Sequence, residues 1–313
     1  MSGGPQGTGP AILALGEPMV EFNQTRQSEP NYLQGYGGDT SNAIIACARQ
    51  GAPSGYITRL GNDEFGRMLA ALWKAEGVDA SGVAIDPAAH TAVYFVTHDI
   101  KGHVFSYLRE GSAASRIAPG DIPEHLIRGA RYLHVSGISQ AISVSACEAA
   151  FHAMKVARAA GVKVSYDTNL RLKLWPLERA REVMRRAIAM SDYLLPSLED
   201  MQAIAGLEDP DAILDWCFAQ GASNVVLKLG KQGCIAATPE LRTPIAGHSV
   251  KAVDATGAGD CFDGAFLARL HFGDDMVSAA RYANAAAALT TTGFGAVAPL
   301  PRREAVQAFL ETQ

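Results

Sequence analysis

Short apolar runs alternate with longer segments of helical periodicity along almost the whole chain. The predicted strands lie at 12–15, 55–58, 132–135, 162–166, 193–195, 225–229 and 234–237. The predicted helices lie at 41–50, 64–76, 143–160, 177–190, 211–220, 257–272, 276–292 and 302–310. A glycine stands where several of these helices end, as is typical of a helix C-terminus: Gly51, Gly77, Gly161 and Gly221. This alternation predicts an α/β fold with a mainly parallel sheet covered by helices on both faces.

The length and composition fit a folded domain of this kind. The 313 residues are 48% hydrophobic and 19% charged, so the chain can bury a sizeable core and is not a disordered one. One large α/β domain with a small appendage fits the length as well as two domains do. The net charge of −5 argues against a nucleic-acid partner, although not against a small anionic substrate. The charge-free stretch 283–301 lacks the hydrophobicity of a membrane span.

The cysteines indicate a cytoplasmic protein with reduced thiols. They are odd in number, lie far apart and form no C-x-x-C pair, so a disulfide framework or a zinc site is not expected: Cys47, Cys147, Cys217, Cys234 and Cys261. Residues 1–10 have neither the basic nor the apolar region of a signal peptide. We expect them to form a flexible leader.

One region breaks the strand–helix pattern. The strand-like runs 91–98 and 103–108 are joined by a short segment containing Gly102, which predicts a β-hairpin. The alternation is only partial, so one face of the hairpin is expected to be exposed or covered by another element. A hairpin inserted into an α/β domain predicts a lid, to which the polar, extended stretch 20–34 adds. The exposed face predicts a homo-oligomer formed through this lid.

The most informative motif is Asp254-Ala-Thr-Gly-Ala-Gly-Asp260, which follows a predicted strand at 249–253 and opens a long apolar helix. Free N–H groups at a helix start, together with the positive end of its dipole, form an anion site. The segment 257–259 (Gly257, Ala258 and Gly259) is therefore predicted to cradle a phosphoryl group. Asp260, in the first helical turn, is expected to stay ionised and to accept the proton of an attacking hydroxyl.

A simpler interpretation is a glycine turn followed by an aspartate with no chemistry, and for an isolated motif of this length that interpretation is favoured. Other phosphate-binding or catalytic motifs are absent from the sequence. It contains no G-x-x-x-x-G-K-S/T, no G-x-G-x-x-G after the first strand, no H-E-x-x-H and no G-x-S-x-G. Walker-type enzymes and nicotinamide dehydrogenases are therefore poorly supported.

Two further motifs appear in order before this one. They are Gly37-Gly-Asp-Thr-Ser-Asn42, which begins a helix, and Leu60-Gly-Asn-Asp-Glu-Phe-Gly66. Together with the C-terminal motif they resemble the ribokinase-like, phosphofructokinase-B-type carbohydrate kinases over roughly the whole chain. The resemblance implies a three-layer α/β/α domain at 11–313 with a mainly parallel central sheet and a small β-sheet lid from about 17–36 and 90–110. It also implies ATP-dependent phosphorylation with Asp260 as the base.

Within that family the chain most resembles the 2-keto-3-deoxygluconate kinases. The segments that carry this resemblance are Gly16-Glu-Pro18, Gly37–Asn42, Tyr107-Leu-Arg109-Glu-Gly-Ser-Ala-Ala-Ser115 and Asp167-Thr-Asn169-Leu-Arg171-Leu-Lys-Leu-Trp175. The resemblance implies transfer of a phosphoryl group to the terminal hydroxyl of a sugar acid, giving the 6-phosphate. The substrate-binding residues that it implies are Gly37, Gly38, Asp39, Asn42, Tyr94, Tyr107, Arg109, Asn169 and Arg171.

The two arginines are chemically suited to a sugar acid. A guanidinium pairs with a carboxylate through two parallel hydrogen bonds, so Arg109 in the lid and Arg171 at a strand end predict a clamp. Lone arginines are more often solvated surface residues, and that alternative stays open. Tyr94 and Tyr107, on neighbouring strands, equally fit a ligand contact or a cross-strand aromatic pair.

The resemblance places ATP against the C-terminal half of the chain. The nucleotide-binding residues that it implies are Ser197, Lys228, Gly230, Gly233, Thr256, Gly257, Gly259 and Asn284. Gly230 and Gly233 also fit a plain strand-to-strand turn. The family's Asn-x-x-Glu segment is replaced here by Ser197-Leu-Glu-Asp200, so Asp200 is expected to act on Mg²⁺ only through water. The resemblance also allows for a monovalent cation, for which the sequence indicates no residues.

The sequence is compatible with three functions. The first is a 2-keto-3-deoxygluconate kinase. The second is a kinase for a neutral sugar such as fructose or ribose, or for a nucleoside. The third is a non-catalytic sensor of sugar or nucleotide on the same fold, which an intact Asp260 disfavours because a sensor needs no base.

Overall fold

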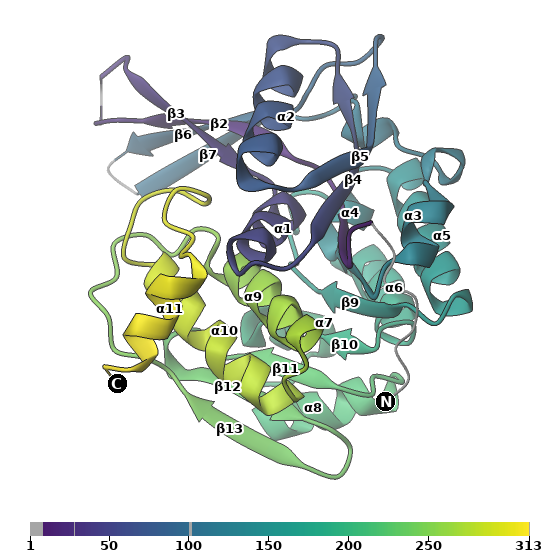
Figure 1. Ribbon diagram of the computed structural model, residues 1–313, viewed down its shortest axis with the longest axis vertical. Coiled ribbons are helices and arrows are strands. Elements are labelled where there is room, and N and C mark those ends of the chain that lie inside the picture. The colour runs from purple at the N-terminus through teal and green to yellow at the C-terminus, as the bar shows by residue number, and fades with distance from the viewer. Residues whose placement is uncertain (1–8, 28, 100–101, 313) are drawn as a thin grey trace.

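The structure is a computed structural model that describes residues 9–27, 29–99 and 102–312. Residues 1–8 of the predicted leader, and residues 100–101 of the predicted hairpin turn, lie outside the described residues. Figure 1 shows the elements of the chain and their order in space.

A nine-stranded sheet forms the centre of the molecule, with the strand order β13-β12-β11-β10-β9-β8-β1-β4-β5. From β11 to β5 neighbouring strands pair in parallel, whereas β12 and β13 extend one edge in antiparallel pairing. The predicted α/β fold with a mainly parallel sheet is confirmed. The strands are β1 (Ile12–Leu15), β4 (Ser54–Gly61), β5 (Asp79–Asp86), β8 (Tyr132–Ser136), β9 (Lys163–Asp167), β10 (Tyr193–Leu194), β11 (Val225–Lys228), β12 (Gly233–Ala237) and β13 (Arg242–Ala246).

Helices cover both faces of this sheet, because successive strand residues point to opposite sides. In β1, Ile12 belongs to one buried core and Leu13 to the other. The first core is covered by α1 (Asp39–Arg49), α2 (Glu64–Glu76), α9 (Ala258–Phe272), α10 (Met276–Thr290) and α11 (Arg303–Leu310). The second is covered by α3 (Glu124–Gly129), α4 (Gly137–Ala141), α5 (Val144–Ala159), α6 (Leu177–Ile188), α7 (Leu198–Ala205) and α8 (Pro210–Ala219).

All eight predicted helices match the structure to within two residues at each end. The glycines predicted to end helices adopt positive φ, for example Gly77 at 73° and Gly161 at 74°. Within the described residues, every helix falls short of the length and hydrophobicity that a membrane crossing needs.

The predicted strand at 249–253 is wrong. These residues join no strand, and the backbone N–H of Val253 donates instead to the carbonyl of Thr291 at 2.7 Å. The segment leaves the edge strand β13 and reaches the end of α10, where the N–H of Asp254 also donates to Thr291, instead of adding a strand to the sheet. Conversely, β13 was not predicted, because its sequence contains Pro244, a residue that sheets tolerate mainly at an edge.

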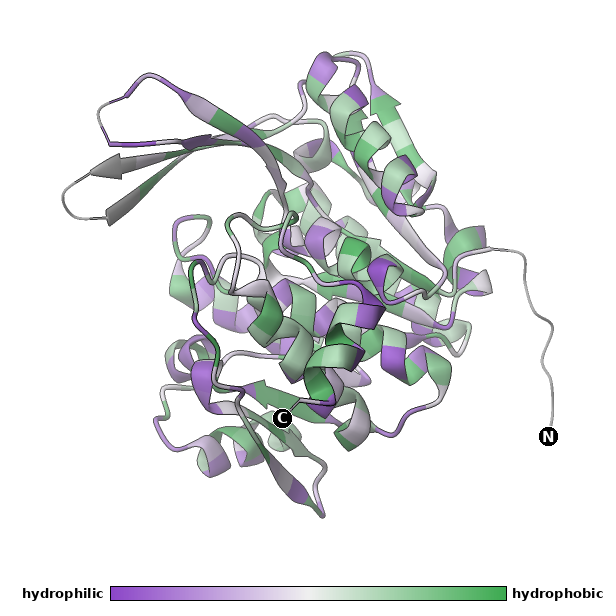
Figure 2. Cartoon of the chain, turned by 60° about the vertical axis from the view of Figure 1, so that its left-hand side comes forward, coloured by the Kyte–Doolittle hydropathy of each residue, from purple (hydrophilic) through white to green (hydrophobic). Residues whose placement is uncertain are grey.

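A second sheet, called the small sheet below, has the strand order β3-β2-β6-β7. Its strands are β2 (Met19–Gln24), β3 (Tyr32–Gly37), β6 (Val93–Asp99) and β7 (Gly102–Leu108). The predicted hairpin is confirmed as the antiparallel pair of β6 and β7, and the extended stretch 20–34 supplies most of the other two strands. Figure 2 shows the small sheet standing out from the body of the chain. Closure of this sheet over a ligand, as the predicted lid implies, stays a prediction.

Candidate active site

Two helix N-termini, those of α1 and α9, lie side by side at the carboxyl edge of the sheet. The residue before each helix is a glycine with positive φ, Gly38 at 101° and Gly257 at 77°. A Cβ atom on Gly38 would lie 2.3 Å from the carbonyl oxygen of Glu17, and one on Gly257 would lie 2.8 Å from that of Ala296. Only glycine fits either position, so the free N–H groups of both helices can point at one site.

The side chains at these two N-termini bond to one another. Asn42 in α1 donates from Nδ2 to Oδ2 of Asp260 in α9 at 2.8 Å. Asn169, after β9, donates from Nδ2 to Oδ2 of Asp39 at 3.0 Å. The structure therefore brings together four of the residues that the sequence predicted for catalysis and substrate binding.

The expectation that Asp260 stays ionised needs correction. Removal from bulk water and the nearby carboxyl of Asp39 raise the pKa of Asp260 to about 7, although the bond from Asn42 lowers it. Burial likewise raises the pKa of Asp39. The helix dipole that favours the charged form is thus outweighed by desolvation and a like charge, neither of which can be read from the sequence around Asp260.

Beneath this cluster, Lys228 at the end of β11 lies between two buried carboxyl groups. Its Nζ is 3.0 Å from Oδ1 of Asp263 and 3.2 Å from Oδ2 of Asp167. Although burial opposes it, these two carboxyls raise the pKa of Lys228, and Lys228 in turn lowers the pKa of Asp167. Burial and the charge of Asp167 raise the pKa of Asp263 well above its usual range. The two carboxyls that flank the ammonium group thus have pKa values shifted in opposite directions.

Asp167 and Asp263 were not among the functional residues predicted from the sequence. Two features of the sequence pointed to them. Asp263 follows Asp260 by three positions, which places it on the same side of α9, and Asp167 opens the segment that contains Asn169. Neither signal indicates that both carboxyls meet one lysine.

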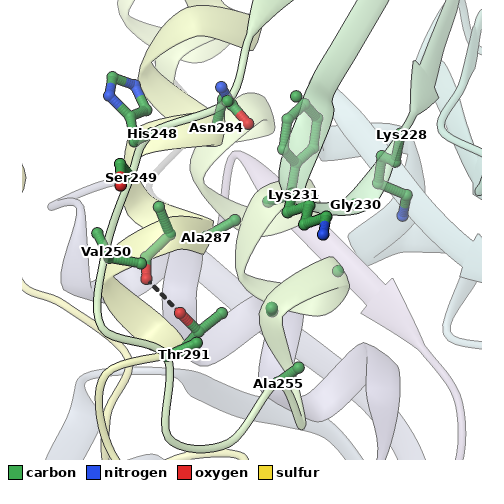
Figure 3. Close-up of a pocket in the computed structure, with 17 residues that line it drawn as sticks. Lys228, Gly230, Lys231, His248, Ser249, Val250, Ala255, Asn284, Ala287 and Thr291 are labelled. Atoms are coloured by element: carbon green, nitrogen blue, oxygen red, sulfur yellow. Dashed lines mark hydrogen bonds between the residues drawn. The ribbon is translucent and has the colours of Figure 1, made fainter.

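A cavity of about 580 Å³ adjoins this site. Figure 3 shows Lys228, Gly230 and Lys231 on one side, the loop carrying His248, Ser249 and Val250 on the other, and Asn284 and Ala287 between them. Five of the eight predicted nucleotide-binding residues line the cavity: Lys228, Gly230, Gly233, Gly259 and Asn284. Ser249 and Val250 of this loop were predicted to lie in a strand, and His248 was not singled out.

The other predicted nucleotide residues have local roles in the structure. Ser197 caps α7, where its Oγ accepts a bond from the backbone N–H of Asp200. Thr256 donates from Oγ1 to Oδ1 of Asp254 at 2.7 Å, inside the turn that precedes α9. Gly257 forms the N-cap of α9 as described above. A contact between ATP and these three residues stays a prediction.

The small sheet supplies an aromatic pair. Tyr94 lies directly opposite Tyr107, and their rings stack with centroids 5.7 Å apart, so the cross-strand interpretation is confirmed. Tyr94 also donates from its hydroxyl to Glu21, and a Cβ atom on Gly37 would lie 2.5 Å from that hydroxyl. Because Gly37 has no side chain, the Tyr94 ring can pack directly against the backbone of β3 at this position. Contact of either tyrosine with a ligand stays a prediction.

The two arginines predicted to clamp a carboxylate differ in their surroundings. Arg109 donates to Glu17, a side chain that is fully buried and also accepts a bond from Ser112 at 2.8 Å. Arg171 is exposed, and its Nη1 donates to the carbonyl of Leu170 at 2.8 Å. The charge of Arg109 is thus already balanced within the protein.

Asp200, the predicted indirect magnesium residue, is tied to the loop after β9. Its Oδ2 accepts bonds from the Thr168 hydroxyl at 2.9 Å and from the Leu170 N–H at 3.0 Å, and burial raises its pKa. Among the described residues there is no group of three or more His, Cys, Asp or Glu side chains placed to hold a metal ion. A role for Asp200 through water stays a prediction.

Comparisons with known proteins agree with this geometry. The family described as pfkB family carbohydrate kinase matches residues 10–303. Fructokinase-2 of Solanum habrochaites is 35% identical over 310 residues, which cover 93% of this chain and 93% of that protein. A fructokinase from Xylella fastidiosa with bound ATP has a TM-score of 0.89 and 26% identity, covering 96% of this chain and 98% of that one. A fructokinase from Vibrio cholerae O395, with fructose, ADP and calcium ion bound, has a TM-score of 0.88 and 30% identity, covering 96% of this chain and 99% of that one.

Proposed function

The chain belongs to the pfkB family of carbohydrate kinases, and from this premise we propose that it transfers the γ-phosphoryl group of ATP to a hydroxyl of a neutral sugar of the fructose type. The sequence favoured a sugar acid and kept a neutral sugar as its alternative. The relatives named above are fructokinases, so the alternative is the better supported of the two.

The observation that carries the proposal is the charge around the acceptor site. Carboxyl groups from Glu17, Glu21, Asp39 and Asp260 gather there, and Arg109 is already paired with Glu17. An anionic sugar would place a further negative charge beside these buried carboxyls, and the guanidinium of Arg109 that could pair with it is already bonded to Glu17. A neutral sugar meets carboxyl oxygens that accept hydrogen bonds from its hydroxyls.

Two acceptor atoms support the same choice. Oδ1 of Asp39 and Oδ1 of Asn42 are buried and accept no hydrogen bond from the described residues. Buried acceptors are nearly always satisfied in folded proteins. A sugar hydroxyl that donates to either atom when the site closes would meet this need.

The proposed transfer uses the side chains at the two helix N-termini. The ionised carboxyl of Asp260 accepts the proton of the acceptor hydroxyl as its oxygen bonds to the γ-phosphorus, and the bond to the β–γ bridging oxygen breaks to release ADP. Asn42 holds the carboxyl of Asp260 in position through the bond to Oδ2. The backbone N–H groups of Gly257 and Gly259 and the positive end of α9 stabilise the negative charge that moves across the phosphoryl group, whereas the N–H of Ala258 is occupied by the carbonyl of Ala255 at 3.2 Å.

ATP is proposed to occupy the cavity of about 580 Å³, with its phosphates near Lys228 and the N-terminus of α9. The described residues include no group of three or more acidic, His or Cys side chains placed to bind a metal ion. Mg²⁺ does not need such a group, because it keeps several waters and binds chiefly through the phosphates of its substrate. Bound there, Mg²⁺ would neutralise phosphate charge, with Asp200 acting through water.

The test is ADP release with Mg-ATP and, separately, fructose, ribose, adenosine, gluconate and 2-keto-3-deoxygluconate. We expect the highest kcat/KM for fructose. Arg171→Ala should change that value only a few-fold, since a neutral sugar has no carboxylate to pair with. Activity confined to the keto-deoxy acid, together with a large loss in Arg171→Ala, would contradict the neutral-sugar proposal. Binding of sugar or ATP without ADP release from any acceptor would favour the sensor.

A further inference from the structure

A second depression, of about 410 Å³, lies over α5 and α6. These helices pack on the core opposite the one that α1 and α9 cover, so the depression is separate from the candidate active site. Lys155 of α5 and Arg179 and Arg186 of α6 line it, and nothing in the proposed kinase reaction uses them.

The basic side chains of this depression are unpaired. Within the residues that the structure describes, Lys155, Arg179 and Arg186 form neither an ion pair nor a hydrogen bond. Other arginines of the chain do find carboxylates, as Arg49 does with Glu76. In a protein with a net charge of −5, three cations that form no ion pair around one depression give a local excess of positive charge.

Two other ionisable residues line the depression. Glu148 is its one acidic side chain, so the basic side chains outnumber the acidic one. His152 is engaged elsewhere, because its Nε2 lies 2.9 Å from Oε1 of Glu124. The remaining charge is therefore positive and open to solvent.

The helices present these side chains from two fixed faces. Phe151 and Lys155 are four residues apart on α5, and Arg179 and Arg186 are seven residues apart on α6, so each pair shares a helix face. The Arg186 guanidinium carbon lies 4.2 Å from the centroid of the buried Phe151 ring. A guanidinium stacked on a ring is held in place by that contact, and its fork of N–H donors matches phosphate oxygens.

We propose that this depression binds the phosphate group of a small molecule, at a site separate from the ATP and sugar sites. A phosphate dianion matches both the excess charge and the two guanidinium forks better than a single carboxylate does. The volume lies within the range of small-molecule sites, roughly 300–1,000 Å³. The proposal does not depend on which sugar the enzyme phosphorylates.

The experiment titrates the full chain with inorganic phosphate by calorimetry while a non-hydrolysable ATP analogue and fructose saturate the active site. Saturable binding that remains under these conditions belongs to a second site. We expect the double variant Arg179→Ala and Arg186→Ala to weaken it by roughly tenfold or more, since charge-assisted hydrogen bonds are lost. Arg185→Ala is the matched control, because Arg185 is on the same helix but lies over the Trp216 ring.

Glu148→Gln gives a test in the opposite direction. Removing the one acidic side chain of the depression should tighten phosphate binding several-fold while leaving the fold unchanged, since Glu148 is exposed. A parallel titration with a sugar phosphate separates the sources, because tighter binding than that of inorganic phosphate indicates a phosphorylated metabolite as the ligand. The absence of saturable binding, or binding that neither the double variant nor Glu148→Gln alters, would overturn the proposal.

Discussion

Opposing effects act on the carboxyl of Asp260. The N-terminus of α9 and the bond from Asn42 favour its ionised form, whereas loss of solvent and the charge of Asp39 favour the protonated form. The second pair of effects prevails and raises the pKa to about 7. A base with a pKa near the working pH takes up a proton readily and is still partly ionised.

The pH dependence of the reaction follows from this value. Since the ionised carboxyl is the base, kcat/KM should fall about tenfold per pH unit as the pH drops below about 7. Asn42→Ala removes a bond that lowers the pKa of Asp260, so its midpoint should move to higher pH. A wild-type profile that stays flat from about pH 5 to pH 8 would contradict Asp260 as the base.

Asp260→Asn should separate activity from stability. The variant should release almost no ADP, with a loss of about 10²-fold or more, and still bind ATP. A carboxyl whose pKa is raised on folding stabilises the folded state at low pH and loses that contribution as the pH rises through about 7. Asp260→Asn should therefore unfold at higher denaturant than wild type at pH 8 but not at pH 4. Equal midpoints at both pH values would show that the carboxyl is not perturbed.

The two carboxyls that hold Lys228 should respond differently to the same substitution. Burial and the charge of Asp167 raise the pKa of Asp263 and favour its protonated form, so we expect Asp263→Asn to disturb the charge balance around Lys228 little. Asp167→Asn removes the ionised partner and leaves the Lys228 ammonium buried without a counter-charge, at a cost of about 3–5 kcal/mol. Denaturant unfolding at pH 7 measures both variants. Equal costs of Asp263→Asn and Asp167→Asn would contradict this difference between the two carboxyls.

At the scale of elements, α9 carries the phosphate-binding end of the site. Its first residues follow Gly257 and its last precede Gly273, and both glycines adopt positive φ, at 77° and 100°. They differ in their surroundings, because a Cβ atom on Gly257 meets Ala296, whereas one on Gly273 meets nothing within 4 Å. The two ends of one helix thus offer a matched comparison.

Gly257→Ala should displace the N-terminus of α9 and lower kcat by about tenfold or more, since the backbone N–H groups would no longer meet the phosphoryl group in line. Gly273→Ala should cost about 1 kcal/mol of stability through backbone strain alone and leave kcat unchanged. Steady-state kinetics and denaturant unfolding give the two quantities. Equal effects of the two variants on kcat would indicate general destabilisation rather than loss of the anion site.

At the scale of the whole molecule, the small sheet leaves apolar side chains in solvent. Leu33 is 67% exposed and Leu108 is 59% exposed, and other exposed apolar residues of the sheet are Tyr32, Val104, Phe105 and Tyr107. The register places Leu33, Phe105 and Tyr107 on one face of the sheet and Tyr32, Val104 and Leu108 on the other. Exposed apolar side chains on both faces of a projecting sheet are unusual for a monomer, because large exposed apolar areas are normally covered by a partner. The homo-oligomer predicted from the sequence remains the proposed state, with a second copy of this chain as the partner.

Sedimentation at micromolar concentration tests this assembly. We expect a dimer or larger species for wild type and dissociation in the double variant Leu33→Lys and Leu108→Lys, since charged side chains would oppose burial of the sheet. Leu241→Lys is the control, because Leu241 is 61% exposed but lies between β12 and β13, away from the small sheet. A monomeric wild type, or dissociation caused by Leu241→Lys, would contradict an interface on the small sheet.

Much of the fold could be predicted because local sequence controls it. Helical periodicity and C-terminal glycines predicted the main helices to within two residues, and strand–helix alternation predicted the parallel sheet. The anion site also follows from local chemistry, since small residues at a helix start leave N–H groups free. The two edge strands β5 and β13 and the loop 248–250 were missed because sheet edges depend on which neighbours are present.

The sequence by itself determined the α/β architecture, the glycine turn before α9 and the presence of Asp260 in its first turn. Only the tertiary structure decided how those groups are charged. Arg109 meets Glu17 across 92 positions and Asn42 meets Asp260 across 218, and no local pattern encodes such pairs. The pKa of a carboxyl and the ion pairing of an arginine depend on burial and on distances between residues remote in the sequence. These quantities are defined only when the chain is folded.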